Sequence, residues 1–224
     1  MTEEKFRIDD QTMALRVAKE FQDGHAVNLG IGVPTLASNF IPGDREVIFH
    51  AENGVLGYGM ICTAGTGSYD LLNAGGQPVE ARPGMCILDH AESFCVIRGG
   101  WLDYTVLGGL QVSEKGDLSN WMVPAKQVGT IGGAMDLALG AKNVIVVMPH
   151  NTKDGGYKIV KQCTYPITGF ACVNLIVTDI AVMEVTPEGI VLKEVAPTWT
   201  AEEVQAVTEP KLIIAPDLHD IELA

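Results

Sequence analysis

The sequence predicts an α/β fold: a single domain with an open, mixed and mostly parallel sheet that is flanked by helices. Several short segments consist almost wholly of β-branched and other apolar residues, as strands buried on both faces of a sheet do. These segments alternate with segments of helical periodicity, which is the order typical of α/β domains. With 224 residues and 47% hydrophobic content, the chain can bury a full core. We therefore predict one domain over residues 1–224.

The first predicted element is a helix that begins at the Asp9–Asp10 pair. Apolar residues recur at helical spacing between Met13 and Phe21, and Gly24 stands in the position of a helix stop. Residues 26–29 follow as a predicted strand.

A tight turn over residues 30–33 comes next. Pro34 is suited to the first position of a second helix, because its missing N–H is not needed there. We expect this helix to run to about Phe40. The order of helix, strand, glycine turn and helix is that of an α/β unit.

The rest of the chain continues in the same style. Two further helices are predicted, one over residues 133–139 between glycines and a short one after the capping box at residues 200–203. Further strands are predicted at residues 47–51, 85–88, 94–97, 105–107, 144–148, 173–177, 181–185, 190–195 and 212–215.

The composition excludes several classes of function. A formal net charge of −13 argues against a nucleic-acid partner. The five cysteines are scattered without a C-x-x-C pair and the histidines lack metal spacing, so we expect neither disulfides nor a metal site. The N-terminus has no apolar targeting segment, and no apolar run approaches the roughly 20 residues of a membrane span. We expect a cytoplasmic protein with no membrane association.

The most informative candidate residue is Glu52. It follows the apolar run 47–51, so its carboxylate should emerge at the carboxyl end of a strand, where open α/β sheets bind ligands. Three glycines follow within residues 54–59, and glycine lets backbone approach a bound molecule. A carboxylate is ionised at neutral pH and can act as a covalent nucleophile without a partner base. The alternative is a turn carboxylate that only caps backbone N–H groups.

Two glycine turns are further candidates for binding. Gly30 and Gly32 lie between a strand and a helix, where they can cradle a phosphate or an amide, but Thr35 in the third position argues against a dinucleotide site. Gly132, Gly133 and Ala134 open a helix, where free N–H groups can stabilise an oxyanion; close packing of helix on sheet is the alternative.

The residue after the candidate nucleophile also allows two interpretations. Asn53 can orient Glu52 or donate to its substrate, while an Asn-Gly pair is equally typical of a tight turn.

The segment 51–59 resembles the Ser-Glu-Asn-Gly signature of the family I coenzyme A transferases, specifically of their β subunits. The resemblance extends over nearly the whole chain. It departs at Ala51, where serine is common, and at Trp101, where histidine is usual. The other matching blocks are residues 28–34, 91–94, 97–100, 117–122, 132–137, 150, 152–155, 163–169 and 175–179.

This resemblance implies a mechanism and a partner. Glu52 is expected to accept the acyl group and then hold CoA as a glutamyl thioester, with the glycine loop at residues 132–134 as the oxyanion site. An α subunit is expected to complete an αβ heterodimer or an α2β2 heterotetramer. The substrates are an acyl-CoA and a carboxylate, here a short 3-oxoacid such as acetoacetate; CoA is a substrate, and no permanently bound cofactor is expected.

CoA itself is expected to contact Gly30, Gly32 and Lys153. Lys153, Lys158 and Lys161 lie close together in the sequence and can meet CoA phosphates, although a solvated basic loop is the alternative. Two other functions stay open: an acyl-CoA hydrolase, if water reaches the glutamyl thioester, and a CoA- or effector-binding subunit without catalysis.

Overall fold

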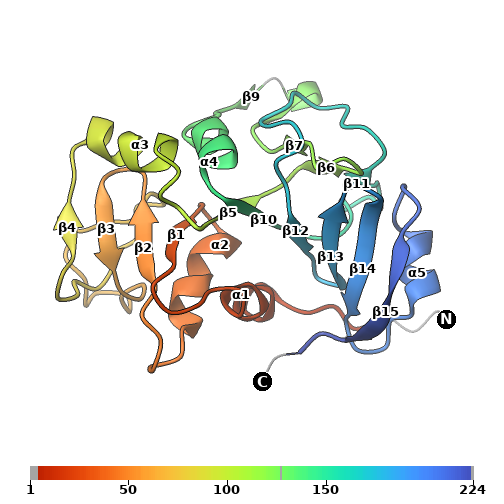
Figure 1. Cartoon of the computed structure of the whole chain (residues 1–224), viewed down its shortest axis with the longest axis horizontal. Helices are drawn as coiled ribbons and strands as arrows, with labels where there is room; N and C mark the ends of the chain where they lie inside the picture. Colours follow the sequence, from red (N-terminus) through yellow and green to blue (C-terminus); the bar gives the residue numbers. More distant parts are fainter. Residues whose placement is uncertain (1–4, 127, 223–224) are drawn as a thin grey trace.

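The computed structural model describes residues 5–126 and 128–222, which are built around one ten-stranded sheet (Figure 1). In spatial order its strands are β15 (Ile213–Asp220), β14 (Gly189–Val195), β13 (Ala181–Thr186), β12 (Leu175–Val177), β10 (Asn143–Val147), β5 (Tyr104–Gly108), β1 (Ala26–Leu29), β2 (Ile48–Ala51), β3 (Val55–Tyr58) and β4 (Cys86–Ile87).

The centre of the sheet is parallel and its two flanks are mixed. Strands β12, β10, β5, β1 and β2 run parallel to one another. On one side β3 and β4 continue the sheet as antiparallel strands. On the other side β13 and β14 are antiparallel, and β15 is parallel to β14. The predicted mixed, mostly parallel α/β sheet is confirmed.

Helices cover both faces of the sheet (Figure 1). One face carries α1 (Asp10–Ala18), α2 (Val33–Leu36) and the 3-10 turn η1 (Ala37–Phe40); the other carries α3 (His90–Arg98) and α4 (Ala134–Gly140), and α5 (Ala201–Ala206) packs against β14.

Successive residues of the central strands face opposite sides. Val106 and Ile145 belong to the core under α1 and α2, whereas Leu107 and Val146 belong to the core under α3 and α4. Continuous apolar runs therefore mark these strands in the sequence, because both of their faces are buried.

Two small sheets were not predicted. One is formed by β6 (Gln111–Ser113), β7 (Leu118–Ser119) and β11 (Ile159–Val160), and the other by β8 (Met122–Val123) and β9 (Val128–Gly129), which the 3-10 turn η2 (Pro124–Lys126) connects. Strands of two or three residues are too short to show a periodic pattern.

Most predicted elements are confirmed with shifted ends. The Asp9 carboxylate accepts the Thr12 N–H at 2.8 Å and starts α1, which ends at Ala18, well before Gly24. The predicted second helix is α-helical only to Leu36 and continues as 3-10 turns to Phe40. The capping box before α5 is present.

The predicted strand at residues 94–97 is wrong, because these residues lie inside α3. Asp89 accepts the Glu92 N–H at 2.9 Å, and the Glu92 carboxylate accepts the Asp89 N–H at 3.2 Å. This reciprocal capping favours a helix. Ser93 and Ile97, four residues apart, are the buried positions of α3, so its pattern has helical periodicity.

The glycines after Glu52 serve chain packing, which corrects the expectation that they open space for a ligand. Gly54 has φ +115°, and a Cβ there would lie 2.2 Å from the Leu88 carbonyl oxygen. The Leu88 N–H donates to the Gly54 oxygen at 2.8 Å, which ties the β2–β3 hairpin to β4. Only glycine satisfies both the conformation and the close approach.

Gly54→Ala is therefore expected to lower the free energy of unfolding by about 3 kcal/mol, because it adds a disfavoured φ and a clash with fixed backbone. Urea denaturation measures the change. Gly43→Ala is the matched control, since a Cβ at Gly43 meets nothing within 4 Å. Equal stability of the two variants would contradict the packing role of Gly54.

Candidate active site

Glu52 follows β2 directly, at the carboxyl edge of the parallel part of the sheet, and its side chain is half-buried. The neighbouring strand β1 pairs with β2 so that Asn28 lies opposite His50. From this position the Asn28 amide nitrogen donates to Glu52 Oε2 at 3.2 Å and to the His50 carbonyl oxygen at 3.1 Å. One oxygen of the carboxylate is thus held by a fully buried donor.

A buried polar network supports Asn28 from below. Thr105 Oγ1, on β5, donates to Asn28 Oδ1 at 3.3 Å. His50 Nδ1 lies 3.2 Å from the Asn28 amide nitrogen, and His50 Nε2 lies 3.0 Å from Ser93 Oγ on α3. Because the Asn28 nitrogen can only donate, this network assigns the single proton of neutral His50 to Nε2. Burial lowers the pKa of His50 to about 4, so the ring is neutral at pH 7.

The predicted glycine loop reaches the same carboxylate. A Cβ placed on Gly133 would lie 3.5 Å from Glu52 Cγ and 3.2 Å from Phe94 Cζ, so the loop before α4 is in contact distance of the candidate nucleophile. The Ala134 N–H is bonded to the Ile131 oxygen at 3.1 Å. Among the described residues, the N–H groups of Gly132 and Gly133 have no such partner and are the available donors.

Asn53 has a structural contact of its own. Its side chain is exposed, and its amide nitrogen donates to the Leu72 carbonyl oxygen at 2.8 Å. This bond fastens the long connection between β3 and β4 beside Glu52. The structure therefore agrees with the turn interpretation of Asn53, while its predicted role toward substrate stays a prediction.

A buried tyrosine lies near the carboxylate. The Tyr58 side chain is 1% exposed, and burial, then the charge of Glu52, raises the pKa of its hydroxyl. The phenol is neutral at physiological pH and adds no second charge beside Glu52.

The turn after β1 contains Gly30 and Gly32, next to Glu52 in the order of strands. Gly30 donates to the Val106 oxygen at 2.8 Å, and a Cβ there would lie 2.9 Å from that oxygen, so packing against β5 explains this glycine. Gly32 has φ +93° and faces open space, with the exposed Ile31 beside it. Both predicted CoA contacts stay predictions.

Lys153 lies elsewhere on the molecule. It follows β10, three strands away from β2, and lines a pocket of about 970 Å³ with Lys158 and Tyr165. Strands are spaced by about 4.8 Å, so the two strands are separated by roughly 14 Å before the twist of the sheet adds to it. The structure does not bring Lys153 together with Glu52.

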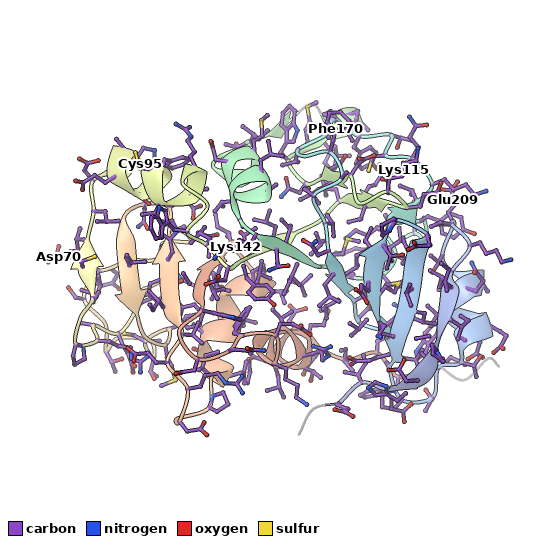
Figure 2. All side chains as sticks on the ribbon, viewed as in Figure 1. Asp70, Cys95, Lys115, Lys142, Phe170 and Glu209 are labelled. Atoms are coloured by element: carbon purple, nitrogen blue, oxygen red, sulfur yellow. The ribbon has the colours of Figure 1, made fainter. Side chains whose placement is uncertain are left out.

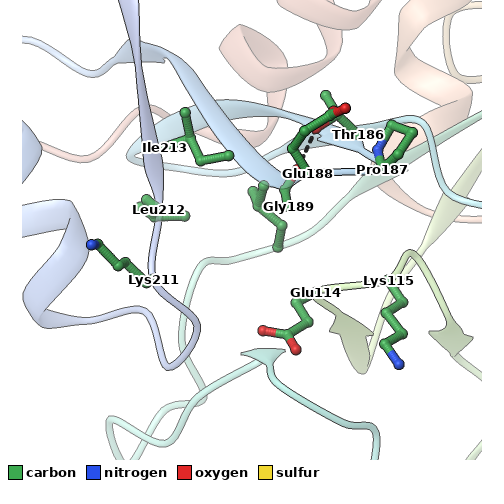
Figure 3. Close-up of a pocket in the computed structure, with 10 residues that line it drawn as sticks. Glu114, Lys115, Thr186, Pro187, Glu188, Gly189, Lys211, Leu212 and Ile213 are labelled. Carbon is green, nitrogen blue, oxygen red and sulfur yellow. Dashed lines mark hydrogen bonds between the residues drawn. The ribbon is translucent and has the colours of Figure 1, made fainter.

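A further hollow of about 610 Å³ lies at the far flank of the sheet (Figure 3). The β13–β14 turn with Glu188 and the segment before β15 with Lys211 face Glu114 and Lys115 across it. Two acids and two lysines balance one another, and none of the predicted site residues lines this hollow.

Sequence reasoning missed the residues beneath Glu52. Asn28 interrupts an otherwise apolar strand, and His50 does the same two residues before Glu52. Polar residues inside buried strands must find partners, which was the available signal. Ser93 and Thr105 gave no signal, because hydroxyl residues are common at such positions.

Metal-ligating side chains are dispersed over the molecule. Within residues 5–126 and 128–222, no three His, Cys, Asp or Glu side chains are grouped so that they could hold a metal ion. None of the helices in the described part of the chain has the length and apolar character to cross a membrane.

Comparison with known sequences identifies the family. A family model described as coenzyme A transferase matches residues 10–206. The chain belongs to the coenzyme A transferase family. It is 50% identical over 208 residues to the β subunit of the 3-oxoadipate CoA-transferase of Pseudomonas putida, over 92% of this chain and 97% of that one. The β subunit of the acetate CoA-transferase of Escherichia coli (strain K12) is 46% identical over 209 residues, with 93% and 95% covered.

Solved CoA-transferases share the fold. An acyl-CoA transferase from Escherichia coli O157:H7 superposes with a TM-score of 0.76 at 20% identity, over 100% of this chain and 45% of that chain. This CoA-transferase chain therefore spans about half the length of that enzyme. The resemblance to β subunits is confirmed, since the sequence relatives bear that description.

The two buried histidines make stability depend on pH. Burial lowers the pKa of both His50 and His150 to about 4 from the usual 6.5. Below pH 6.5 the unfolded chain binds two protons that the folded chain excludes, so stability falls as the pH drops towards 4. We expect a slope of about 1.4 kcal/mol per pH unit for each histidine near pH 5.

Urea denaturation between pH 7 and 5 measures this slope. His150→Asn should reduce it by about half, since one of the two proton-excluding groups is gone. His90→Asn, at an exposed position, should leave it unchanged. An unaltered slope in His150→Asn would contradict the assignment.

Proposed function

We propose that this chain is the β subunit of an acyl-CoA:carboxylate CoA-transferase, in which Glu52 carries CoA as a covalent glutamyl thioester. The observation that carries the proposal is the convergence on one carboxylate of the buried Asn28 amide at 3.2 Å and the glycine loop at Gly133. A carboxylate that only capped a turn would need neither.

The chemistry proceeds by acyl exchange. A Glu52 oxygen attacks the thioester carbonyl of the donor acyl-CoA, the carbon–sulfur bond breaks, and a mixed anhydride and CoA thiolate are formed. The thiolate then attacks the glutamyl carbonyl, the donor carboxylate leaves, and the glutamyl-CoA thioester remains. An acceptor carboxylate reverses both steps. Each bond broken is matched by one formed, so thioester energy is conserved without ATP.

The surroundings of Glu52 suit this sequence. Asn28 holds Oε2, which leaves Oε1 for attack and keeps the carboxylate in one orientation. Each addition creates an oxyanion, and the free N–H groups of Gly132 and Gly133 lie on the loop nearest to it. Such donors contribute roughly 3 to 4 kcal/mol each to transition-state stabilisation. Neutral Tyr58 and neutral His50 add no charge that would oppose it.

An α subunit is the proposed partner, in an αβ heterodimer or α2β2 heterotetramer. Two observations support it: the chain spans about half of a related single-chain enzyme, and exposed apolar side chains gather on the side of α3 and α4. Figure 2 shows Phe170 on that side. The exposed apolar residues of this surface are Trp101, Met135, Leu139 and Phe170. Patches of this kind mark interaction surfaces on soluble proteins.

The proposed acceptor is a short 3-oxoacid, with acetoacetate as the example and a short-chain acyl-CoA as donor. The names of the relatives support this class in part, since 3-oxoadipate is a 3-oxoacid while acetate is not. Substrate preference follows from the shape of the acyl pocket, which an α subunit would complete.

Glu52→Gln is expected to lower CoA-transfer activity of the complex with the α subunit by about 10⁴-fold or more, because the amide cannot form the anhydride. Glu80→Gln, at an exposed position, is the matched control. In the unmodified complex, incubation with acyl-CoA followed by borohydride should convert Glu52 to the reduced alcohol, as located by mass spectrometry. Labelling at another residue, or none, would overturn the mechanism.

The hydrolase alternative is separated by products. A transferase forms the new acyl-CoA only when an acceptor carboxylate is present, whereas a hydrolase releases free CoA in its absence. The half-buried Glu52 admits some solvent in this chain alone. A complex that liberates free CoA at the same rate with and without acceptor would establish the hydrolase. A binding-only subunit would retain its physiological effect in Glu52→Gln.

A further inference from the structure

The pocket beyond β10 concentrates positive charge on an acidic chain. Four of the fifteen Lys and Arg residues line it, although the whole chain carries a net charge of −13. They are Arg7, Lys126, Lys153 and Lys158. The volume of about 970 Å³ is within the range of small-molecule sites. We define these residues and the space between them as the lysine pocket.

Lys158 is the unusual member. Its side chain is only 9% exposed, yet no ion pair or hydrogen bond to its ammonium group is found in the described part of the chain. Burial lowers the pKa of this amine to about 8, with the charge of Asp179 opposing the shift. A buried cation without a partner is costly, and proteins retain such groups where a ligand supplies the missing charge.

The two acids of the pocket do not fill that role. Asp179 accepts from Arg7 Nη1 at 2.7 Å and from the His150 N–H at 2.7 Å. Asp154 is exposed, and a bond with Thr152 lowers its pKa. Both carboxylates are occupied by other donors, whereas Lys126 and Lys153 form no ion pair among the described residues.

Three separate chain segments direct these lysines to the pocket. Lys126 comes from the connection between β8 and β9, Lys153 from the turn after β10, and Lys158 from the residue before β11. Three ammonium groups around one space suit a ligand that carries several negative charges at one place. A phosphate group, with about −1.5 to −2 charges and several acceptor oxygens, meets this need better than a single carboxylate.

We propose that the lysine pocket binds the phosphate groups of a small molecule, with Lys158 as its buried anchor and Lys126 and Lys153 at the rim. The phosphates can belong to CoA or to a free phosphate compound, since the chemistry of recognition is the same. The site is distinct from Glu52 and does not depend on the function proposed for that residue.

Isothermal titration calorimetry of the full chain, alone and co-expressed with its α subunit, tests this with pyrophosphate and with CoA as separate probes at low ionic strength. Lys158→Met keeps the length of the side chain and removes the charge, and we expect binding to weaken by about tenfold or more. Lys161→Met is the matched control, because Lys161 is exposed and does not line the pocket.

The two probes distinguish the source of the phosphate. Weakened binding of CoA alone assigns the pocket to CoA, and weakened binding of both probes assigns it to phosphate compounds in general. Should Lys158→Met fail to fold, Lys153→Gln at the exposed rim gives the same comparison. Equal affinity of unmodified and Lys158→Met protein for both probes, or no binding of either probe to the unmodified protein, overturns the proposal. Neither result bears on borohydride labelling of Glu52.

Discussion

The parallel pairing of β1 with both β2 and β5 is the constraint on which the candidate site depends. It places Asn28 between His50 and Thr105, so one buried amide bonds to the neighbouring strands and to Glu52. A buried polar group left without a partner costs about 1 to 3 kcal/mol, so this network is stable only when all of its members are in place. The orientation of the carboxylate is therefore a property of the sheet.

The glycines of the chain divide by the atoms that surround them. Gly54 and Gly30 approach carbonyl oxygens so closely that no side chain would fit, and both hold neighbouring strands together. Gly133 approaches Glu52 and Phe94 instead. A motif rich in glycine thus combines a rigid hairpin behind the carboxylate with a close contact in front of it. Rigid support of this kind keeps a reacting group in position.

The distribution of charge separates two regions of the molecule. The network around Glu52 is uncharged apart from the carboxylate, because burial keeps His50 and Tyr58 neutral. Positive charge gathers at the lysine pocket on the other side of the parallel strands, against the negative charge of the chain as a whole. An anionic substrate or partner would therefore be attracted locally and not by the protein as a whole.

The sequence by itself determined the fold class, the central strands, the position of Glu52 at a strand end and the family, because these depend on local patterns and on a contiguous motif. It misassigned residues 94–97, since apolar content there outweighed the capping box that starts α3. Only the tertiary structure decided that Asn28 bonds to Glu52, that Gly133 touches it and that Lys158 is buried without a partner. These are contacts between segments distant in the chain, and strand order and register, which no local pattern encodes, bring them together.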